Sequence, residues 1–191
     1  KESILPSLDA INKRLRVRLG EALATVTEES RPLEKVVTAN LDALRAYSLA
    51  YKAHAAGDFR QARTLYLHAL ELDPDFARAR IELGVLHTDL DESEEASAQF
   101  RRALAANDRL TRTDRMMAEA WLLTQSSPRQ ALEKWKAIAA LEPDNFSVQG
   151  TYAYLLWWHA NDFAAAIEAD KRNAVPQNPN SGVGHYLLGA L

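Results

Sequence analysis

The chain has 191 residues, 47% of them hydrophobic and 26% charged, and its formal net charge is −3. Lys and Arg (23) nearly balance Asp and Glu (26), which argues against nucleic-acid binding because domains that bind nucleic acid are usually markedly basic. Cysteine is absent, which excludes disulfides, thiolate metal sites and cysteine nucleophiles. No apolar run approaches the roughly 20 residues of a membrane-spanning helix, so we expect no membrane contact by this chain itself.

Residues 1–40 are predicted to form an N-terminal amphipathic helix and a linker. Apolar residues recur at helical spacing between residues 4 and 26. One interpretation is that this helix packs on the rest of the chain. The other is that the near-heptad order of residues 8–22 continues a dimerising or signalling coil from an upstream segment, although Arg18 at a core position of the heptad weakens it.

The linker is the polar, turn-rich stretch 27–40, where Pro32 interrupts any helix and Thr38 or Asn40 is placed to cap the next one. Beyond it, residues 41–191 are predicted to alternate helices of about 12 to 15 residues with short loops. The expected loops lie at residues 57–58, 73–74, 91–93, 126–128, 143–145, 161–162 and 176–181.

A pattern of small, aromatic and apolar residues recurs along this second region. Its clearest copy, residues 57–74, has a Gly-Asp-aromatic turn, a helix with an aromatic between two alanines, and a closing Asp-Pro. The first copy has Leu49, Ala50, Ala62, Tyr66 and Ala69; the second, 34 residues later, has Leu83, Gly84, Ala96, Phe100 and Ala103; the third has Ala131, Trp135 and Ile138; the fourth has Ala153, Asn161, Asp162, Phe163 and Ala166; a fifth begins at His185.

The residue types have a physical reason. Small residues let the two helices of a pair approach closely, and the aromatic fills the space between one pair and the next. Because no single pair buries its apolar face alone, stacking of pairs supplies the core. This pattern resembles the tetratricopeptide repeat, a 34-residue helix pair, over residues 41–191. The resemblance implies an all-α fold: a right-handed superhelix of antiparallel helix pairs, with about four repeats, the start of a fifth, and the additional N-terminal helix.

A second resemblance concerns the lead-in, which reads RVRLGEAL from Arg16, RPLEKV from Arg31 and TANLDALRAY from Thr38. It is similar to the lead-in of tetratricopeptide regions that end certain bacterial signalling proteins, in which a Ser/Thr kinase, nucleotide cyclase or winged-helix output domain precedes a membrane segment. The cyclase type associated with peptide-modification systems is the nearest. The resemblance implies that this chain, which we interpret as a piece of a longer polypeptide, is the sensor or partner-binding end of such a protein and is extracytoplasmic (periplasmic), otherwise cytoplasmic.

No pattern indicates catalysis. The sequence lacks a glycine-rich phosphate cradle, a GxSxG elbow and an HExxH motif, and the five histidines do not fall at metal-ligand spacing. We therefore expect a non-enzymatic chain with no catalytic residue, no cofactor and no metal.

In tetratricopeptide arrays the first helix of each pair lines a concave groove, and the resemblance implies that defined positions of these helices face a protein or peptide ligand. Arginine suits carboxylates and aromatic rings are rigid anchors, so an extended acidic or amphipathic peptide is the expected ligand. The family's chaperone-tail ligand is not expected, because tyrosines replace the Lys/Asn pair that would hold it in the first repeat. The residues predicted to contact a ligand or partner are Tyr47, Tyr51, His54, Arg78, Arg112, Arg115, Glu119, Tyr154 and Trp158.

Several of these aromatic residues have a structural alternative. Tyr47 and Tyr51 could pack against the N-terminal helix. Adjacent helical residues point about 100° apart, so of Trp157 and Trp158 at most one faces the groove squarely and the other belongs to the core. Trp121 and Trp135 are predicted to pack between helices. At the level of function, the alternative is self-association, as a homodimer, through the N-terminal helix or the terminal repeats.

Overall fold

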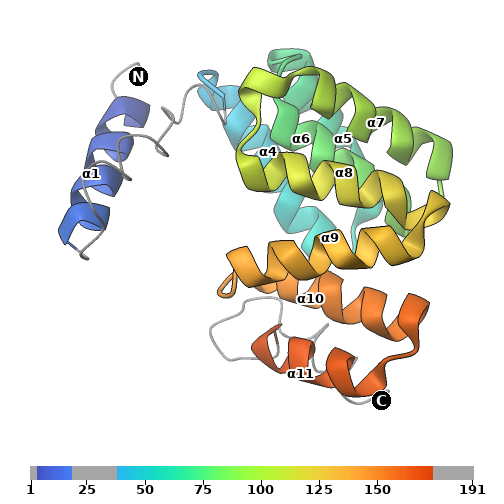
Figure 1. Ribbon diagram of the computed structural model, residues 1–191. Coiled ribbons are helices and arrows are strands. Elements are labelled where there is room, and N and C mark those ends of the chain that lie inside the picture. The colour runs from blue at the N-terminus through green and yellow to red at the C-terminus, as the bar shows by residue number, and fades with distance from the viewer. Residues whose placement is uncertain (1–3, 19–37, 174–191) are drawn as a thin grey trace. The chain divides into compact units, whose positions relative to one another are not determined.

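The computed structural model describes residues 4–18 and 38–173, and the described residues form helices joined by short loops, without a strand (Figure 1). The predicted all-α fold is confirmed. None of the described helices is long and apolar enough to cross a membrane. The helices are α1 (Ile4–Arg18), α4 (Leu41–Ala55), α5 (Phe59–Leu72), α6 (Ala77–Asp89), α7 (Ser93–Ala105), α8 (Arg112–Ser126), α9 (Pro128–Leu141), α10 (Phe146–Leu155) and α11 (Phe163–Asn173), with a 3₁₀ turn η1 (Asn107–Arg109) and a π-helical turn η2 (Leu156–Ala160).

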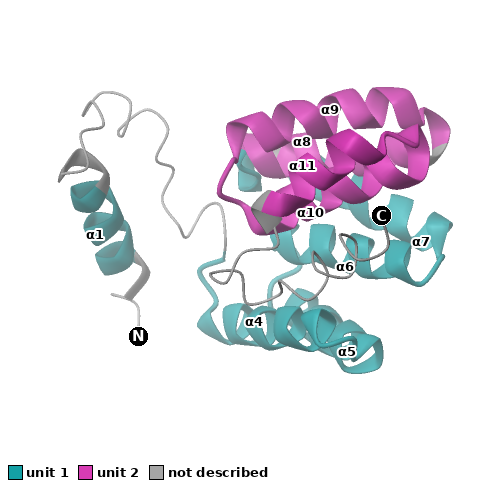
Figure 2. Ribbon diagram, turned by 90° about the horizontal axis from the view of Figure 1, so that it is seen from below, with its two compact units in different colours: residues 1–111 teal, residues 112–191 magenta. Residues whose placement is uncertain are grey.

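The chain divides into two compact units, Lys1–Thr111 and Arg112–Leu191 (Figure 2). In unit 1, α4 pairs with α5 and α6 with α7, and α5 also packs on α6. In unit 2, α8 pairs with α9 and α10 with α11, and α9 also packs on α10. These are the sequential helix pairs that the repeat pattern predicts. The predicted start of a fifth repeat and the end of the predicted helix 4–26 lie outside the described residues.

The core of unit 1 is built from small and aromatic residues at the predicted positions. Ala50 of α4 and Ala62 of α5 are fully buried, which lets the helices of the first pair approach closely. Tyr66 fills the space beyond them against Leu83 and Leu86 of the second pair. Small residues therefore lie where the helices of a pair meet and an aromatic residue lies between the pairs, as expected from the sequence.

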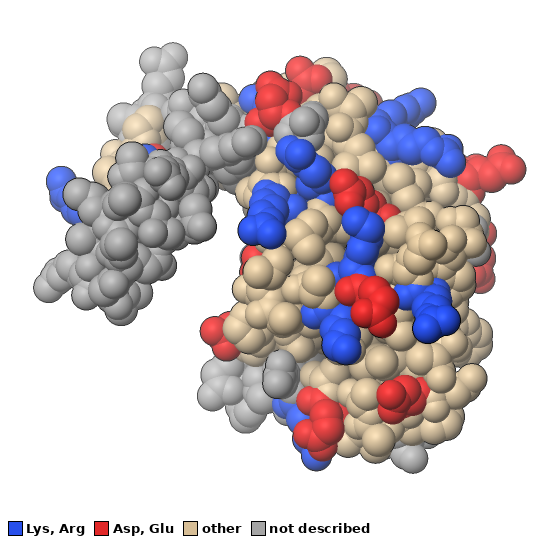
Figure 3. Space-filling model, viewed as in Figure 1, with Lys and Arg blue, Asp and Glu red and all other residues tan. Residues whose placement is uncertain are grey.

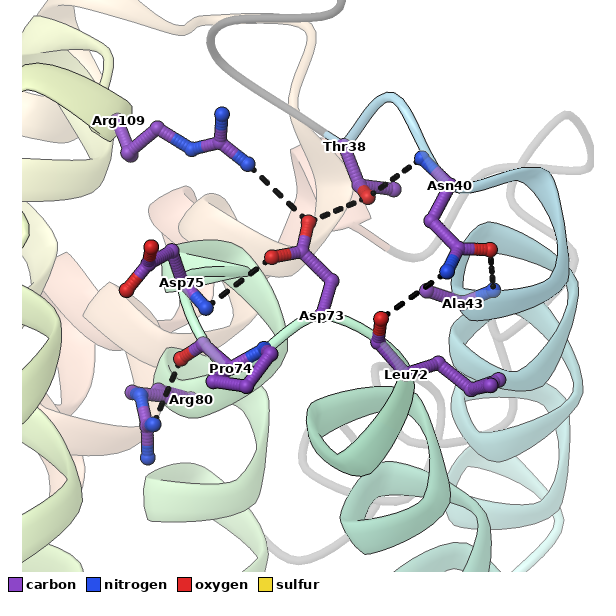
Figure 4. Close-up of polar contacts among 9 residues, drawn as sticks. All are labelled: Thr38, Asn40, Ala43, Leu72, Asp73, Pro74, Asp75, Arg80 and Arg109. Atoms are coloured by element: carbon purple, nitrogen blue, oxygen red, sulfur yellow. Dashed lines mark hydrogen bonds and ion pairs between the residues drawn. The ribbon is translucent and has the colours of Figure 1, made fainter.

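The start of α4 is tied to the end of α5. The Asn40 side chain accepts hydrogen bonds from the backbone N–H groups of Asp42 and Ala43, and its amide donates to the Leu72 carbonyl at 3.0 Å (Figure 4). Asn40 thus satisfies donors at one helix end and an acceptor at the other, which confirms it as the cap of α4.

The carboxylate of Asp73 joins three segments of unit 1 (Figure 4). It accepts hydrogen bonds from the Thr38 hydroxyl at 2.5 Å, from the backbone N–H of Asp75 at 3.1 Å and from the Arg109 guanidinium at 3.1 Å. Arg109 lies in η1, so the Asp-Pro that ends the first repeat also anchors the end of the second.

Unit 2 has a tryptophan core. Trp135 of α9 is fully buried, and Trp121 of α8 packs against it edge-on with ring centroids 5.3 Å apart. The predicted inter-helix packing of both tryptophans is confirmed. The buried Gln149 amide of α10 donates to the Ala139 and Glu142 carbonyls at the end of α9, which satisfies carbonyls that have no partner within that helix.

The fourth helix pair contains an irregularity that the sequence did not predict. After Leu155 the chain widens into the π-helical turn η2, which ends at Asn161 in the left-handed conformation, with φ of 52°. The Asn161 N–H bonds the Leu156 carbonyl five residues back, as expected for a π turn.

Candidate binding surfaces

The candidate residues of unit 1 lie on its first helices, α4 and α6. The Tyr47 ring lies 5.1 Å from the Phe76 ring and 6.1 Å from the Tyr66 ring, between centroids. Burial raises the pKa of the Tyr47 hydroxyl to about 12; the nearby Glu82 carboxylate adds to this rise, and Arg78 opposes it. Tyr47 is therefore held within the packed interior of unit 1, by neighbours on α5 and at the start of α6.

Arg78 is paired within the same helix. Its guanidinium lies 2.7 Å from the Glu82 carboxylate one helical turn away, and the side chains are 28% and 8% exposed. Arg78 also hydrogen-bonds Tyr47. Burial, then Glu82, raises the pKa of the half-buried Tyr51 as well. Tyr47, Tyr51 and Arg78 thus meet around one nearly buried carboxylate.

His54, near the end of α4, bridges the first pair to the second. Its Nε2 atom lies 2.8 Å from the Asp89 carboxylate at the end of α6, and its ring meets Tyr66 and Phe59 edge-on. The His54 side chain is 11% exposed and that of Asp89 43%. The structure therefore brings Tyr47, Tyr51 and Arg78 together around Glu82, and it pairs His54 with a separate carboxylate, that of Asp89.

The candidates of unit 2 are spread along α8 and α10. Arg112 is exposed at the start of α8, Arg115 is half-buried, and Glu119 pairs with Lys134 of α9 at 2.7 Å. The charged candidates of α8 thus lie at its start and middle. The aromatic candidates are Tyr154 of α10 and Trp158 of η2.

Tyr154 at the end of α10 forms a cluster with Trp157 and Trp158 of η2, and we call this cluster the aromatic ridge. Tyr154 is 41% exposed and Trp158 62% exposed, and their rings lie within 6° of parallel with centroids 6.4 Å apart. Trp157 is half-buried and packs against Ala153, Leu156 and their neighbours. The two adjacent tryptophans therefore divide between surface and core, as their spacing predicts.

Sequence reasoning did not include Glu82 among the candidate residues. The sequence does contain a signal for Glu82, because Arg78 and Glu82 are four residues apart on one helix and this spacing favours ion pairs. The near burial of the carboxylate depends on how α4 and α5 pack over α6, which local spacing does not reveal.

Charged side chains of both signs are interspersed on the face of the described residues that Figure 3 displays. Within residues 4–18 and 38–173, His, Asp and Glu side chains nowhere gather in a group able to hold a metal ion. The described surfaces thus offer paired charges and aromatic rings as their recognition groups.

Comparison with known families identifies the repeats. Two family profiles, both described as tetratricopeptide repeat, match residues 53–119 and 121–180. Together with the helix pairs of both units, these matches define the class: an all-α repeat protein. The chain belongs to the tetratricopeptide repeat family, whose domains generally bind proteins or peptides and are typically non-catalytic.

Among solved structures, the chain is similar to one titled "MamA RS-1 ArsTM double mutant", with 13% sequence identity and a TM-score of 0.42 over 100% of this chain and 98% of that chain. No curated protein matches the sequence.

Proposed function

We propose that this chain is a non-enzymatic scaffold that binds a protein or an extended peptide through the first helices of its repeats, α4 and α6 in unit 1 and α8 and α10 in unit 2. The observation that carries the proposal is the exposure of Trp158, 62%, beside a second exposed ring, Tyr154. Exposed clusters of large aromatic side chains are typical of interaction sites, and tryptophan and tyrosine are enriched among residues that dominate binding energy.

Unit 1 supports the proposal through prearranged polar groups. Glu82 fixes the Arg78 guanidinium and Asp89 fixes the His54 ring, so these side chains lose little conformational freedom when a ligand binds. An acidic ligand would have to compete with Glu82 for Arg78. Unit 1 therefore suits a ligand that forms hydrogen bonds with the tyrosine hydroxyl and arginine guanidinium groups. It suits a ligand that supplies a carboxylate less well.

Selection of a random peptide library on the immobilised chain tests the proposal. Peptides enriched on the wild type should be lost on Tyr51→Ala, Arg112→Glu or Trp158→Ala, which alter first helices. The matched controls are Arg60→Glu and Arg129→Glu, exposed positions on the second helices α5 and α9. Replacing Arg78 is less informative, because the nearly buried Glu82 carboxylate would lose its ion-pair partner and the fold would be destabilised.

Two results would contradict the proposal. One is a selection that enriches no peptide. The other is a set of peptides that the first-helix variants retain and the second-helix variants lose, which would move the site to the opposite face.

We also propose that the scaffold is the sensor or partner-binding region of a larger bacterial signalling protein. The similarity of the lead-in, from Arg16 to Tyr47, to that of membrane-linked signalling proteins supports this context. The test is the genomic sequence upstream of Lys1. A membrane helix preceded by a cyclase, kinase or winged-helix domain would support the context, and an upstream sequence without such a domain would contradict it.

Self-association through α1 is the second candidate function. Leu8, Ile11 and Leu15 lie one helical turn apart and are 49%, 51% and 52% exposed, so α1 carries an apolar stripe that a second copy would cover. Sedimentation of the wild type against Leu8→Asp combined with Leu15→Asp tests this function. A dimer that the paired substitutions dissociate supports it, whereas a monomeric wild type contradicts it.

A further inference from the structure

The segment that carries the aromatic ridge has no acidic side chain and no Lys or Arg of its own. Residues 145–161, which contain α10 and η2, include no Asp, Glu, Lys or Arg. On this stretch Tyr154 and Trp158 expose parallel rings, and Trp157 stands at 73° to the first and 70° to the second. The segment itself therefore offers a ligand aromatic rings rather than side chains of Asp, Glu, Lys or Arg.

The π-helical turn sets the position of Trp158. Such turns are rare, cost hydrogen-bond geometry, and are found frequently at functional sites. Here the turn lies at the base of the ridge, at Leu156–Ala160, and Asn161 closes it in the left-handed conformation. The backbone irregularity and the exposed tryptophan thus coincide.

We propose that the aromatic ridge binds an uncharged, proline-rich segment in the polyproline II conformation. This inference rests on the proposed scaffold function and names the class of its partner. Proline rings pack against exposed aromatic faces, and aromatic-lined surfaces are the common receptors of such segments. The segment is already extended before it binds, so little conformational entropy is lost.

The hydrogen-bonding groups of a polyproline II segment are complementary to those of the aromatic ridge. A polyproline II segment has carbonyl acceptors without internal partners, and proline supplies no N–H donor. The indole N–H of tryptophan only donates, and the tyrosine hydroxyl also donates. The Trp158 indole N–H is therefore a donor of the kind that pairs with the carbonyl groups of this ligand.

The other peptide classes match less well. Residues 145–161 themselves offer no Lys or Arg to an acidic peptide and no carboxylate to a basic one. An amphipathic helix requires an apolar groove. The exposed residues here are two aromatic side chains with parallel rings, and the proline rings of an extended chain pack against aromatic faces.

Titration of the full chain with a deca-proline peptide tests the inference by tryptophan fluorescence and by calorimetry. We expect the peptide to bind and to shift the tryptophan emission. Trp158→Ala and Tyr154→Ala should each weaken binding about tenfold or more, as for aromatic anchors elsewhere. The matched control is Phe163→Ala, which removes an aromatic that is 48% exposed at the start of α11. Because all three residues are exposed, circular dichroism should show unchanged helicity.

The outcomes separate this inference from the proposed function. Absence of deca-proline binding, or equal binding by Trp158→Ala, overturns the proline-rich partner. A leucine-rich helical peptide that binds more tightly than deca-proline, and depends on Trp158, also overturns it but leaves the scaffold function standing. If the library yields no peptide of any class that binds through a first helix, both the proline-rich partner and the scaffold function are overturned.

Discussion

Gly84 of α6 lies against the Phe100 ring of α7 so closely that a Cβ atom added to it would be 2.6 Å from the Cε1 atom of that ring. Real Cβ atoms essentially never approach a neighbour so closely. Phe100 is 2% exposed and packed on all sides, so its ring cannot swing into solvent. The repeat pattern predicted a small residue, Ala or Gly, at this position, and the approach of the two helices of the second pair leaves room only for glycine.

Gly84→Ala should destabilise the fold. Overpacking a core costs about 1–3 kcal/mol, and the better helix propensity of alanine returns up to about 1 kcal/mol, so we expect a net loss. Urea unfolding measures it as a lower midpoint with an unchanged slope. In the background of Phe100→Leu the same substitution should cost less, because the ring that it meets is gone. A variant as stable as the wild type would contradict the close approach.

Asp73 should be a sensitive loop position of unit 1. Asp73→Ala removes the acceptor for Thr38, for Arg109 and for the backbone of Asp75, and we expect a loss of about 1–3 kcal/mol in the free energy of unfolding. Asp75→Ala, at an exposed neighbouring position, is the control and should stay within about 0.5 kcal/mol of the wild type. Equal effects of the two substitutions would show that the junction in Figure 4 contributes little.

Glu92 should make the fold sensitive to acid. The hydrogen bonds from Arg63 and then from His87 hold the pKa of the Glu92 carboxyl below its ordinary value of 4.5. Because the folded pKa is depressed, this contribution to stability is complete above the unfolded value and is lost as the pH falls through the folded one.

Unfolding measured from pH 6 downward tests this contribution. The wild type should lose stability below about pH 4.5 more steeply than Glu92→Gln, which does not titrate. Glu94→Gln, at an exposed position in the first turn of α7, is the control and should follow the wild type. Parallel curves for the wild type and Glu92→Gln would contradict the coupling.

The helices follow from local sequence, whereas the partners of the candidate side chains do not. Thr38 and Asn40 before an apolar helix were sufficient to predict a cap there, and the spacing of Trp157 and Trp158 was sufficient to predict that they point in different directions. The pairing of His54 with Asp89 joins residues 35 positions apart and depends on how two repeats stack.

The π turn at Leu156–Ala160 was beyond sequence reasoning for a different reason. The surrounding sequence is a good α-helical pattern, and Asn161, which closes the turn, is a residue that tolerates the left-handed conformation but does not require it. Local periodicity placed Trp158 on the first-helix face, but only the structure shows that its ring lies parallel to that of Tyr154.

Tyr47 should make the fold sensitive to alkali. Burial raises the pKa of its hydroxyl from 10.0 to about 12, so the contribution of the neutral form to stability is complete below pH 10 and is lost as the pH rises toward 12. Tyr47→Phe keeps the ring between Tyr66 and Phe76 but cannot ionise. We therefore expect its stability to fall less steeply than that of the wild type between pH 10 and 12, measured by urea unfolding. The difference in absorbance at 295 nm between the wild type and Tyr47→Phe should titrate near pH 12; a midpoint near 10 while the fold persists would contradict the burial of this hydroxyl.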